Sequence, residues 1–246
     1  MSFSVVIPAR LNSSRLKEKV LIELNGIPMV IHVAQRANLS GARNVVIATD
    51  HQKIADVAQY YNFQSVMTDK NHLSGTDRCL EVAKINDWED KEIIVNVQAD
   101  EPLIDPILID LLAKNIKDCR SEYITAYSEF KSYNEFINPN NVKVVLDNNS
   151  NALYFSRSAI PYLNSRDLSL SNYAFHHLGI YAYRLSSLKK FCSFPISDLE
   201  KIEKLEQLRA LSNNLKLKVL PYNGNQIIGV DTIEDLNLVR EILSKQ

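Results

Sequence analysis

Residues 5–19 read VVIPARLNSSRLKEK, and they set the architecture of the whole chain. They open with a short apolar run, and β-branched residues facing both sides are typical of a strand buried in a parallel sheet. The run leads directly into a loop that carries four cations, Arg10, Arg15, Lys17 and Lys19. Open α/β sheets bind ligands at the carboxyl ends of their strands. The loop therefore predicts an anion site, for which a triphosphate is the obvious candidate.

This loop is not rich in glycine, so we expect phosphates to be held by side-chain charge and backbone N–H groups rather than by a Walker-type cradle alone. The simpler alternative is a solvated turn of charged residues. The anion site is favoured because Arg10 follows the buried strand directly and has little room to swing away.

Segments typical of strands and of helices alternate along the first half of the chain. We expect strands at 3–8, 44–49, 64–67 and 93–98, and helices at 28–38, 52–61, 76–86 and 106–116. Asp50 is a plausible cap for the second of these helices. The alternation predicts an α/β fold with a Rossmann-like, mostly parallel sheet and helices on both faces.

The second half is less regular and richer in strands. We expect strands at 123–130, 178–183 and 215–220, a hairpin at 142–146 and 152–156, helices at 199–211 and 232–245, and a polar loop at 164–172. No internal repeat, low-complexity segment or clear linker divides the chain. We therefore expect a single domain, 1–246, whose second half elaborates the same sheet.

Composition excludes several classes of function. The 246 residues are 46% hydrophobic and 23% charged, with a net charge of −1, so no global field favours nucleic acid. The cysteines, Cys79, Cys119 and Cys192, are too widely spaced for a zinc site, and their odd number suits a reducing compartment. No signal peptide or membrane-length apolar run is evident. We expect a soluble cytoplasmic protein without membrane insertion.

Two carboxylates follow apolar stretches where a metal would be useful. Asp100 comes after the expected strand 93–98, and Asp231 lies in the segment Gly229-Val230-Asp231-Thr232. Mg²⁺ prefers one or two carboxylates together with substrate phosphate oxygens, so the pair predicts a divalent metal beside the cationic loop. The alternatives are a turn or cap role for Asp100, and for Asp231 an N-cap of the turn that contains Glu234.

Other candidate site residues are weaker when each is considered alone. The segment LSGTDR contains Ser74 and Arg78 at an expected helix start, which suits either an anion or simple capping by Ser74 or Thr76. Further candidates are scattered through the second half, and each has an ordinary structural alternative: Arg157, His176, His177, Tyr181, Glu206 and Gln207.

The order of short motifs along the chain resembles one enzyme family. VVIPAR, SSRL, ATD, SGTDR, VNVQADEP, NPNNVKVVLD, YFSRSAIPY, HHLGIYAYR, EKLEQLR and GVDTIEDL follow one another nearly end to end. Together they resemble the 3-deoxy-manno-octulosonate cytidylyltransferases, also called CMP-Kdo synthetases. The early motifs are shared with sugar nucleotidyltransferases in general. YFSRSAIPY and HHLGIYAYR favour this family over CMP-sialate synthetases.

The resemblance implies transfer of CMP from CTP to 3-deoxy-manno-octulosonate (Kdo), with release of pyrophosphate, in lipopolysaccharide biosynthesis. It also implies Mg²⁺ as cofactor and a homodimer. Its division of the chain is a CTP-binding half at 1–120, a sugar-binding and dimer-forming part at 121–220, and a return to the sheet at 221–246. We expect the dimer contact in the region 142–156.

The resemblance also assigns roles to individual residues. Lys19, Asp100 and Asp231 would be catalytic, and the two carboxylates would bind the metal. The residues implied to bind CTP are Arg10, Arg15, Lys19, Ser74, Arg78 and Gln98. Those implied to face the sugar acid are Arg157, His177, Tyr181, Glu206 and Gln207.

The chain departs from the family pattern in the cationic loop and after the expected strand 93–98. Lys17 and Glu18 stand where Pro-Gly is common, Val20 stands where proline is usual, and Ala99 replaces a glycine. If position 99 required a positive φ, alanine there would cost about 1 kcal/mol. Alternatives that remain open are a cytidylyltransferase for another acidic sugar, such as 8-amino-Kdo or a sialate, and a non-catalytic nucleotide-binding relative.

Overall fold

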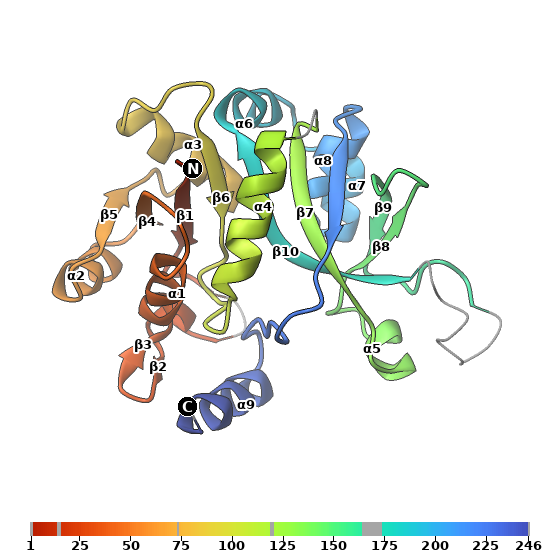
Figure 1. Ribbon diagram of the computed structural model, residues 1–246. Helices are drawn as coiled ribbons and strands as arrows, with labels where there is room; N and C mark the ends of the chain where they lie inside the picture. Colours follow the sequence, from red (N-terminus) through yellow and green to blue (C-terminus); the bar gives the residue numbers. More distant parts are fainter. Residues whose placement is uncertain (1, 14–15, 73, 119–120, 164–173, 246) are drawn as a thin grey trace.

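The computed structural model describes residues 2–13, 16–72, 74–118, 121–163 and 174–245 (Figure 1). The strands of its main sheet are β1 (Ser4–Ala9), β4 (Asn44–Thr49), β5 (Gln64–Met67), β6 (Ile93–Asn96), β7 (Tyr123–Glu129), β8 (Lys143–Leu146), β9 (Ala152–Ser156), β10 (Phe175–Arg184) and β11 (Leu217–Pro221). They run in the order β11-β7-β10-β6-β1-β4-β5, while β8 pairs with β10 and with β9. Strands from both halves of the chain therefore share one sheet.

The sheet is mostly parallel, as the alternation of segments predicts. β1 pairs in parallel with β4 and β6, β4 with β5, and β11 with β7. β10 runs antiparallel to its neighbours β6 and β7, and β8 pairs antiparallel with both β10 and β9. Since β1 and β6 are parallel neighbours, the cationic loop and the loop that carries Asp100 leave the same edge of the sheet.

Helices cover both faces of this sheet (Figure 1). The helices are α1 (Met29–Asn38), α2 (Gln52–Tyr60), α3 (Gly75–Ile85), α4 (Pro106–Asp118), α5 (Tyr133–Ile137), α6 (Leu185–Cys192), α7 (Asp198–Glu203), α8 (Gln207–Ser212) and α9 (Ile233–Ser244). Val5 of β1 belongs to one buried cluster with Ile31 of α1 and Leu108 of α4. Val6, which points the other way, belongs to a second cluster with Leu80 of α3 and Leu188 of α6. Burial on both faces confirms the expectation for this strand.

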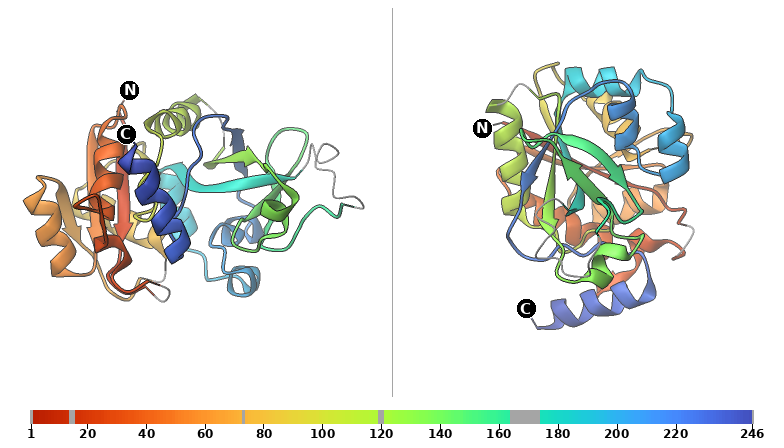
Figure 2. Two further views of the ribbon diagram at one scale, coloured as in Figure 1. Left: turned by 90° about the horizontal axis from the view of Figure 1, so that it is seen from below. Right: turned by 90° about the vertical axis from the view of Figure 1, so that its right-hand side faces the viewer.

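A third and smaller cluster joins the two ends of the described chain. A short 3₁₀ turn, η1 (Lys19–Leu21), leads into a hairpin of β2 (Glu23–Leu24) and β3 (Ile27–Pro28). Leu24 packs with Val230 and with Leu236 and Val239 of α9, which lies beside the hairpin in both views of Figure 2. The 221–246 segment is thereby brought next to the cationic loop. None of the helices in the described ranges is long and apolar enough to cross a membrane.

The expected single helix at 199–211 is wrong. α7 ends at Lys204, whose φ of 55° places it in the left-handed region, and α8 starts only at Gln207. The break buries Leu205 and turns residues 205–207 toward the sheet. A continuous helix could not bring these neighbouring residues to the same wall, because successive side chains on a helix point in directions about 100° apart.

The other differences are smaller. His51, not Asp50, caps α2, because its Nδ1 accepts a hydrogen bond from the Lys53 N–H at 3.2 Å. The expected strand at 178–183 is the end of the longer β10, whose pairing shifts between Leu178 and Tyr181. Helices α5 and α6 and the small hairpin were not expected. The expected polar loop at 164–172 lies outside the described residues.

Candidate functional site

A cleft of about 810 Å³ opens where the loop after β6 faces the second half of the chain. Four parts of the structure form its walls. They are the loop after β6, the turn 138–141 with the segment after β9, strand β10, and the start of α8 with residues 226–235. The sequence-predicted site residues that line it are Gln98, Asp100, Arg157, His177, Tyr181, Glu206, Gln207 and Asp231. The cleft therefore brings together candidates for both substrates.

Lys19 lies between the two expected metal-binding carboxylates. Its Nζ is 2.6 Å from Asp100 Oδ2 and 2.8 Å from Asp231 Oδ1. The backbone reinforces this arrangement, because the Val230 N–H donates to the Asp100 carbonyl at 2.8 Å. The segment that carries Asp231 is thus fastened to the loop that carries Asp100.

Asp231 does not cap the helix that follows it. Thr232 is the N-cap of α9 and forms a capping box with Asp235, whose Oδ2 accepts from the backbone N–H groups of Asp231 and Thr232. The capping alternative for the Asp231 side chain is therefore wrong, and its carboxylate is directed to Lys19 instead.

The charge of Lys19 shows how a cation is accommodated here. Burial lowers the pKa of this lysine, but the carboxylates of Asp100 and Asp231 outweigh it, and the net pKa is raised. An ammonium thus occupies a point where two carboxylates converge. This oxygen donor set fits Mg²⁺, which commonly takes one or two carboxylates and completes its shell with phosphate oxygens and water. The described residues contain no group of three or more His, Cys, Asp or Glu that would hold a metal without such outside ligands.

Glu101 is a site residue that the sequence analysis did not single out. Its side chain lines the cleft and the residue is 9% exposed. Burial, and then the charges of Asp100 and Asp231, raise its pKa to about 8. Its Oε2 has no hydrogen-bond partner among the described residues. Its place next to Asp100 in the motif VNVQADEP was the available signal.

The cationic loop is only partly described. Arg10 and Lys17 are exposed, and Arg15 lies outside the described residues. Glu18, at a position where the family resemblance implies glycine, has a φ of 50°. Ala99 is absent from the described residues with positive φ and is 4% exposed. The condition for a strain cost at position 99 is therefore not met, whereas the backbone at position 18 is one that favours glycine.

The segment around Ser74 both starts helix α3 and lines the cleft. Ser74 caps α3 by accepting from the Asp77 N–H, as the capping alternative predicts. Gly75 allows α3 to start close to the end of β1, because an added Cβ would lie 3.1 Å from Pro8 Cγ. Both Gly75 and Gln98 line the cleft. Ser74 therefore sits beside the cleft with a structural partner of its own.

Arg78 is not brought into the cleft. It is 3% exposed, and its guanidinium donates to Asp50 Oδ2 at 2.6 Å and to Thr68 Oγ1 at 2.7 Å. This arrangement is a structural clamp between α3 and the loops after β4 and β5. Contact between Arg78 and a nucleotide stays a prediction that the structure does not favour.

Arg157 is held from two sides before any substrate arrives. Its Nε donates to the Glu203 carbonyl at 2.9 Å and its Nη1 donates to the Pro139 carbonyl at 3.1 Å. The Glu203 carboxylate accepts from the Arg157 N–H at 2.9 Å and from Ser156 Oγ at 2.6 Å. Five N–H donors are available on a guanidinium. The remaining Nη hydrogens can therefore donate hydrogen bonds to an anion.

His177 has its ring orientation fixed by a threonine. Its Nε2 is 2.9 Å from Thr125 Oγ1, which also lies 2.7 Å from the Ile180 carbonyl. The hydroxyl has one proton, and a carbonyl can only accept, so the short contact to Ile180 assigns that proton. His177 then donates from Nε2, and its Nδ1 is an acceptor. Burial lowers the pKa of His177 to about 3, which keeps the ring neutral.

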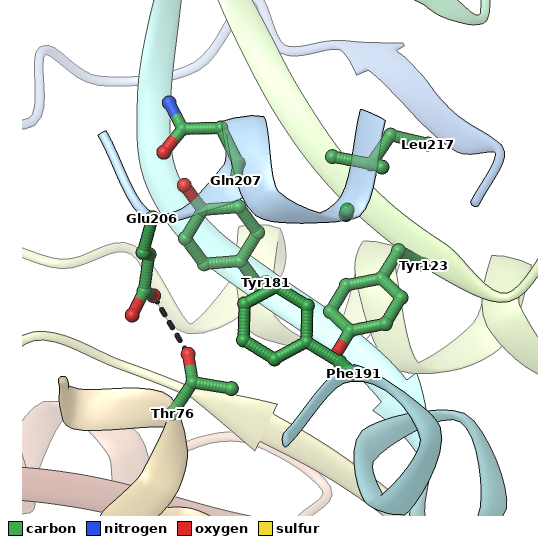
Figure 3. Close-up of a pocket in the computed structure, with 8 residues that line it drawn as sticks. Thr76, Tyr123, Tyr181, Phe191, Glu206, Gln207 and Leu217 are labelled. Atoms are coloured by element: carbon green, nitrogen blue, oxygen red, sulfur yellow. Dashed lines mark hydrogen bonds between the residues drawn. The ribbon is translucent and has the colours of Figure 1, made fainter. Parts of the chain in front are cut away.

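Glu206 and Gln207 lie at the start of α8, and Glu206 faces Thr76 at the start of α3 (Figure 3). Thr76 Oγ1 donates to Glu206 Oε1 at 2.6 Å. Burial raises the pKa of Glu206, although hydrogen bonds from Thr76 and Ser74 oppose the rise. The Tyr181 ring is directed toward the Gln207 side chain in Figure 3, above a cavity of about 10 Å³. That cavity holds about one water molecule, so the substrates belong in the large cleft.

Sequence reasoning missed the residues that hold the predicted ones in place. Thr76 holds Glu206 and Thr125 holds His177, from elements that are far away along the chain. Lys143 is fully buried next to Arg157. Its position at the start of an apolar strand, inside the quoted motif NPNNVKVVLD, was a usable signal. Thr76 was considered only as a cap, and Thr125 carried no signal.

Comparisons with known proteins agree along the whole chain. The model of the cytidylyltransferase family matches residues 4–217. A 3-deoxy-manno-octulosonate cytidylyltransferase of Nitratiruptor sp. is 48% identical over 96% of this chain and 97% of its own length. Proteins of the same name from Neisseria meningitidis, at 44% identity, and Haemophilus influenzae, at 43%, cover 97–99% of both chains.

Solved structures give the same result. A CMP:2-keto-3-deoxy-manno-octonic acid synthetase in complex with CTP has a TM-score of 0.89 and 35% identity, and covers 99% of this chain and 98% of its own. A glucose-1-phosphate thymidylyltransferase from Bacillus anthracis, with a TM-score of 0.68 at 13% identity over 98% and 95% of the two chains, shares the fold alone. With the family model and the curated relatives, these likenesses show that the chain is a nucleotidyltransferase enzyme and belongs to the cytidylyltransferase family, among the 3-deoxy-manno-octulosonate cytidylyltransferases.

Proposed function

We propose that this enzyme transfers CMP from CTP to Kdo and releases pyrophosphate, which supplies the activated sugar for lipopolysaccharide. The convergence of Lys19, Asp100 and Asp231 at one end of the large cleft supports the proposal, because a cation and two carboxylates of a kind that suits Mg²⁺ meet in the same cleft as the residues expected to bind the sugar. The same activity is named for the relatives that match the chain over nearly its full length.

The nucleotide half would act mainly by positioning and by charge. Asp100 and Asp231 would hold Mg²⁺, which neutralises phosphate charge and lowers the pKa of a nearby hydroxyl. Lys19 would turn from its carboxylates to the departing pyrophosphate, and Arg10 and Arg15 would bind the outer phosphates. Such groups stabilise the charge that develops on phosphate oxygens when they are aligned before the reaction begins.

The sugar half would orient the acceptor by its carboxylate and hydroxyls. The Nη hydrogens of Arg157 suit the carboxylate, since a guanidinium binds such an anion through paired donors. The neutral His177 ring would accept a hydrogen bond from a sugar hydroxyl through Nδ1. Tyr181, Glu206 and Gln207 supply further polar contacts along the same wall.

We further propose a homodimer that forms around the β8–β9 hairpin. β9 pairs only with β8 among the described strands, so one of its edges is available, and its Leu153 is 61% exposed. An exposed edge strand with apolar side chains is a ready surface for pairing with a second chain. We place the enzyme in the cytoplasm, where free thiols such as Cys79 and Cys192 stay reduced.

The test is release of pyrophosphate from CTP in the presence of Mg²⁺ and a panel of acidic sugars: Kdo, 8-amino-Kdo and a sialate. We expect release with Kdo and none when the sugar or the metal is left out. A higher kcat/KM with one of the other two acids would replace Kdo as the acceptor. Absence of release with every acid would support the non-catalytic alternative and overturn the proposal.

A further inference from the structure

Lys143 is a buried cation that the reaction does not use. It is 0% exposed, at the first position of β8. Its Nζ donates to three backbone carbonyls, those of Asn138 at 3.1 Å, Asn141 at 2.8 Å and Arg157 at 2.5 Å. An ammonium has three N–H donors, so all of them are used. Burial of a charge is costly unless its hydrogen bonds are made, and here they are made entirely to the main chain.

The three carbonyls belong to two separate walls of the cleft. Asn138 and Asn141 flank the turn that joins α5 to β8, and Arg157 follows β9. All three residues line the cleft on the sugar side. The Arg157 guanidinium meets the same turn, because its Nη1 donates to the Pro139 carbonyl. Lys143 therefore sets the distance between the 138–141 turn and the backbone of the residue expected to bind the acceptor.

We propose that Lys143 is a positioning residue for the acceptor: its ammonium holds the 138–141 turn and the Arg157 segment together so that the Arg157 guanidinium faces the carboxylate of the sugar acid. This inference rests on the proposed function for the identity of the acceptor. It adds a residue that touches no substrate and acts through Arg157. The effect should fall on the acceptor, because the contacts of Lys143 lie outside the Lys19–Asp100–Asp231 group.

The charges around Lys143 make its action dependent on pH. Burial, and then the neighbouring positive charge of Arg157, lower its pKa to about 8, although Glu203 on α7 opposes the change. His176 faces it from β10 and is kept neutral, since burial lowers the pKa of His176 to about 4 despite Glu135 on α5. Below pH 8 the ammonium makes three charged hydrogen bonds. Above pH 8 a neutral amine has only two N–H donors.

The kinetic experiment compares K143M and K143R with the wild-type enzyme, by steady-state pyrophosphate release. We expect K143M to raise the KM for Kdo at least tenfold while the KM for CTP changes less than twofold, and K143R to recover part of the loss. K218M is the matched control, because Lys218 also donates to a backbone carbonyl, that of Asn149, but does not line the cleft. An unchanged KM for Kdo in K143M, or an equal rise for both substrates, would overturn the proposal.

The pH dependence of the KM for Kdo distinguishes the titration of Lys143 from that of Glu101, whose pKa is also about 8. In the wild type the KM for Kdo should rise between pH 7.5 and 9. Arginine stays protonated throughout this range, so the contribution of residue 143 to the rise should vanish in K143R. A profile in K143R with the same amplitude as in the wild type would assign the whole rise to other groups and contradict the role of Lys143.

Hydrogen exchange tests the inference without turnover and without relying on the acceptor. The Asn141 N–H donates to the Asn138 carbonyl and the Arg157 N–H to Glu203, so both amides report on the two walls. We expect the protection factor of each amide, which corrects for the rise of intrinsic exchange with pH, to fall at least tenfold in K143M and to fall also in the wild type above pH 8, while the protection factors of α3 amides stay unchanged. Unchanged protection of both amides in the wild type across pH 8 would overturn the proposal even if K143M did not fold. If the wild type accepts no sugar acid, the proposed function fails, while this measurement still decides the role of Lys143.

Discussion

A single lysine holds two carboxylates together at the nucleotide end of the cleft. Without Lys19, the negative charges of Asp100 and Asp231 would repel each other across a gap that one ammonium now fills. Both contacts are short but partly open to solvent, because the side chains of Asp100 and Asp231 are 31% and 36% exposed. Because of this partial exposure, a metal–nucleotide complex could reach both carboxylates. Its phosphates could then replace them as the partners of the Lys19 ammonium.

Asp100→Asn should abolish most of the activity without unfolding the enzyme. The amide keeps the shape but removes one anionic metal ligand, and loss of such electrostatic stabilisation costs on the order of 10²–10³ in kcat. Pyrophosphate release at saturating CTP and Kdo is the measurement, with the circular dichroism spectrum as the check on folding. The control is Asp198→Asn, an exposed carboxylate on α7. Full activity of Asp100→Asn at saturating Mg²⁺ would remove the metal assignment.

Two neighbouring histidines should make the fold sensitive to acid. Burial lowers the pKa of His176 to about 4 and of His177 to about 3, against about 6.5 in an unfolded chain. Between these values the unfolded state binds more protons than the folded state, so the free energy of unfolding falls as the pH decreases below about 6.5. Each histidine contributes a slope of about 1.4 kcal/mol per pH unit across its window.

Urea unfolding between pH 7 and pH 4 measures this slope. His176→Asn cannot titrate, so its slope should be smaller than that of the wild type by about 1.4 kcal/mol per pH unit between pH 6 and pH 4.5. His51→Asn is the control, because asparagine can still cap α2 there. Equal slopes in the wild type and in His176→Asn would show that His176 is protonated in the folded state.

Individual residues were predictable where the chain places them next to a strand end. Asp100 follows β6 directly, and the position of Asp231 after an apolar stretch suggested either a ligand or a cap. The structure excludes the cap, because Thr232 caps α9 together with Asp235, and the ligand role stays a prediction. Thr125 could not be assigned, because His177 reaches it only after distant strands have paired, whereas the signal of Lys143 in its motif was not used.

At the scale of elements, the left-handed residues explain where local expectations fail. Lys204 divides α7 from α8 with a φ of 55°, and nothing in the amphipathic pattern of 199–211 marks this break. In contrast, Asn25 and Gly26 have φ values of 51° and 80° in the hairpin of β2 and β3. That dipeptide is a strong hairpin signal, so this element was open to prediction and was overlooked.

Glu18→Gly should stabilise the start of η1. A non-glycine residue in the left-handed region costs roughly 1–2 kcal/mol, and glycine avoids this at the expense of about 0.5–1 kcal/mol of unfolded-state entropy. The ion pair of Glu18 with Lys53, at 3.1 Å, is exposed and contributes little. We expect a net gain of about 0.5 kcal/mol in the free energy of unfolding, measured by urea titration.

Glu18→Ala is the matched variant, because alanine removes the ion pair and keeps the strained backbone. It should be no more stable than the wild type. A stability of Glu18→Ala equal to that of Glu18→Gly would mean that the φ of 50° costs nothing at this position.

At the scale of the whole molecule, the class of fold followed from the alternation of segments, but the order of the strands did not. β10 enters the sheet antiparallel between β6 and β7, and nothing in its apolar pattern distinguishes it from the parallel strands. Its insertion is what brings His177 and Tyr181 beside the loop that carries Asp100. The order of the strands in the sheet is therefore what brings the residues expected to bind the sugar beside those expected to bind CTP.

Leu153→Glu should prevent dimerisation. Leu153 is exposed on the edge strand β9, and a charge directed at a second copy would have to be buried without a partner. Analytical ultracentrifugation at micromolar concentration should show a dimer for the wild type and a monomer for the variant. Tyr60→Glu is the control, because Tyr60 is 80% exposed on α2, at the opposite end of the sheet in Figure 1. A dimeric Leu153→Glu would place the contact elsewhere.

Lys19 and Asp231 meet although 212 positions separate them in the sequence, whereas Lys19 and Asp100 are separated by 81. A ribosome makes Lys19 first, then Asp100 and only much later Asp231, and nascent chains begin to fold while synthesis continues. During most of translation Lys19 can therefore find a single carboxylate. A polypeptide that stalls before residue 231 would assemble much of its nucleotide half and still lack the second carboxylate. The site is thus completed late in translation, and an unfinished chain offers Lys19 one of the two carboxylates that the full-length enzyme provides.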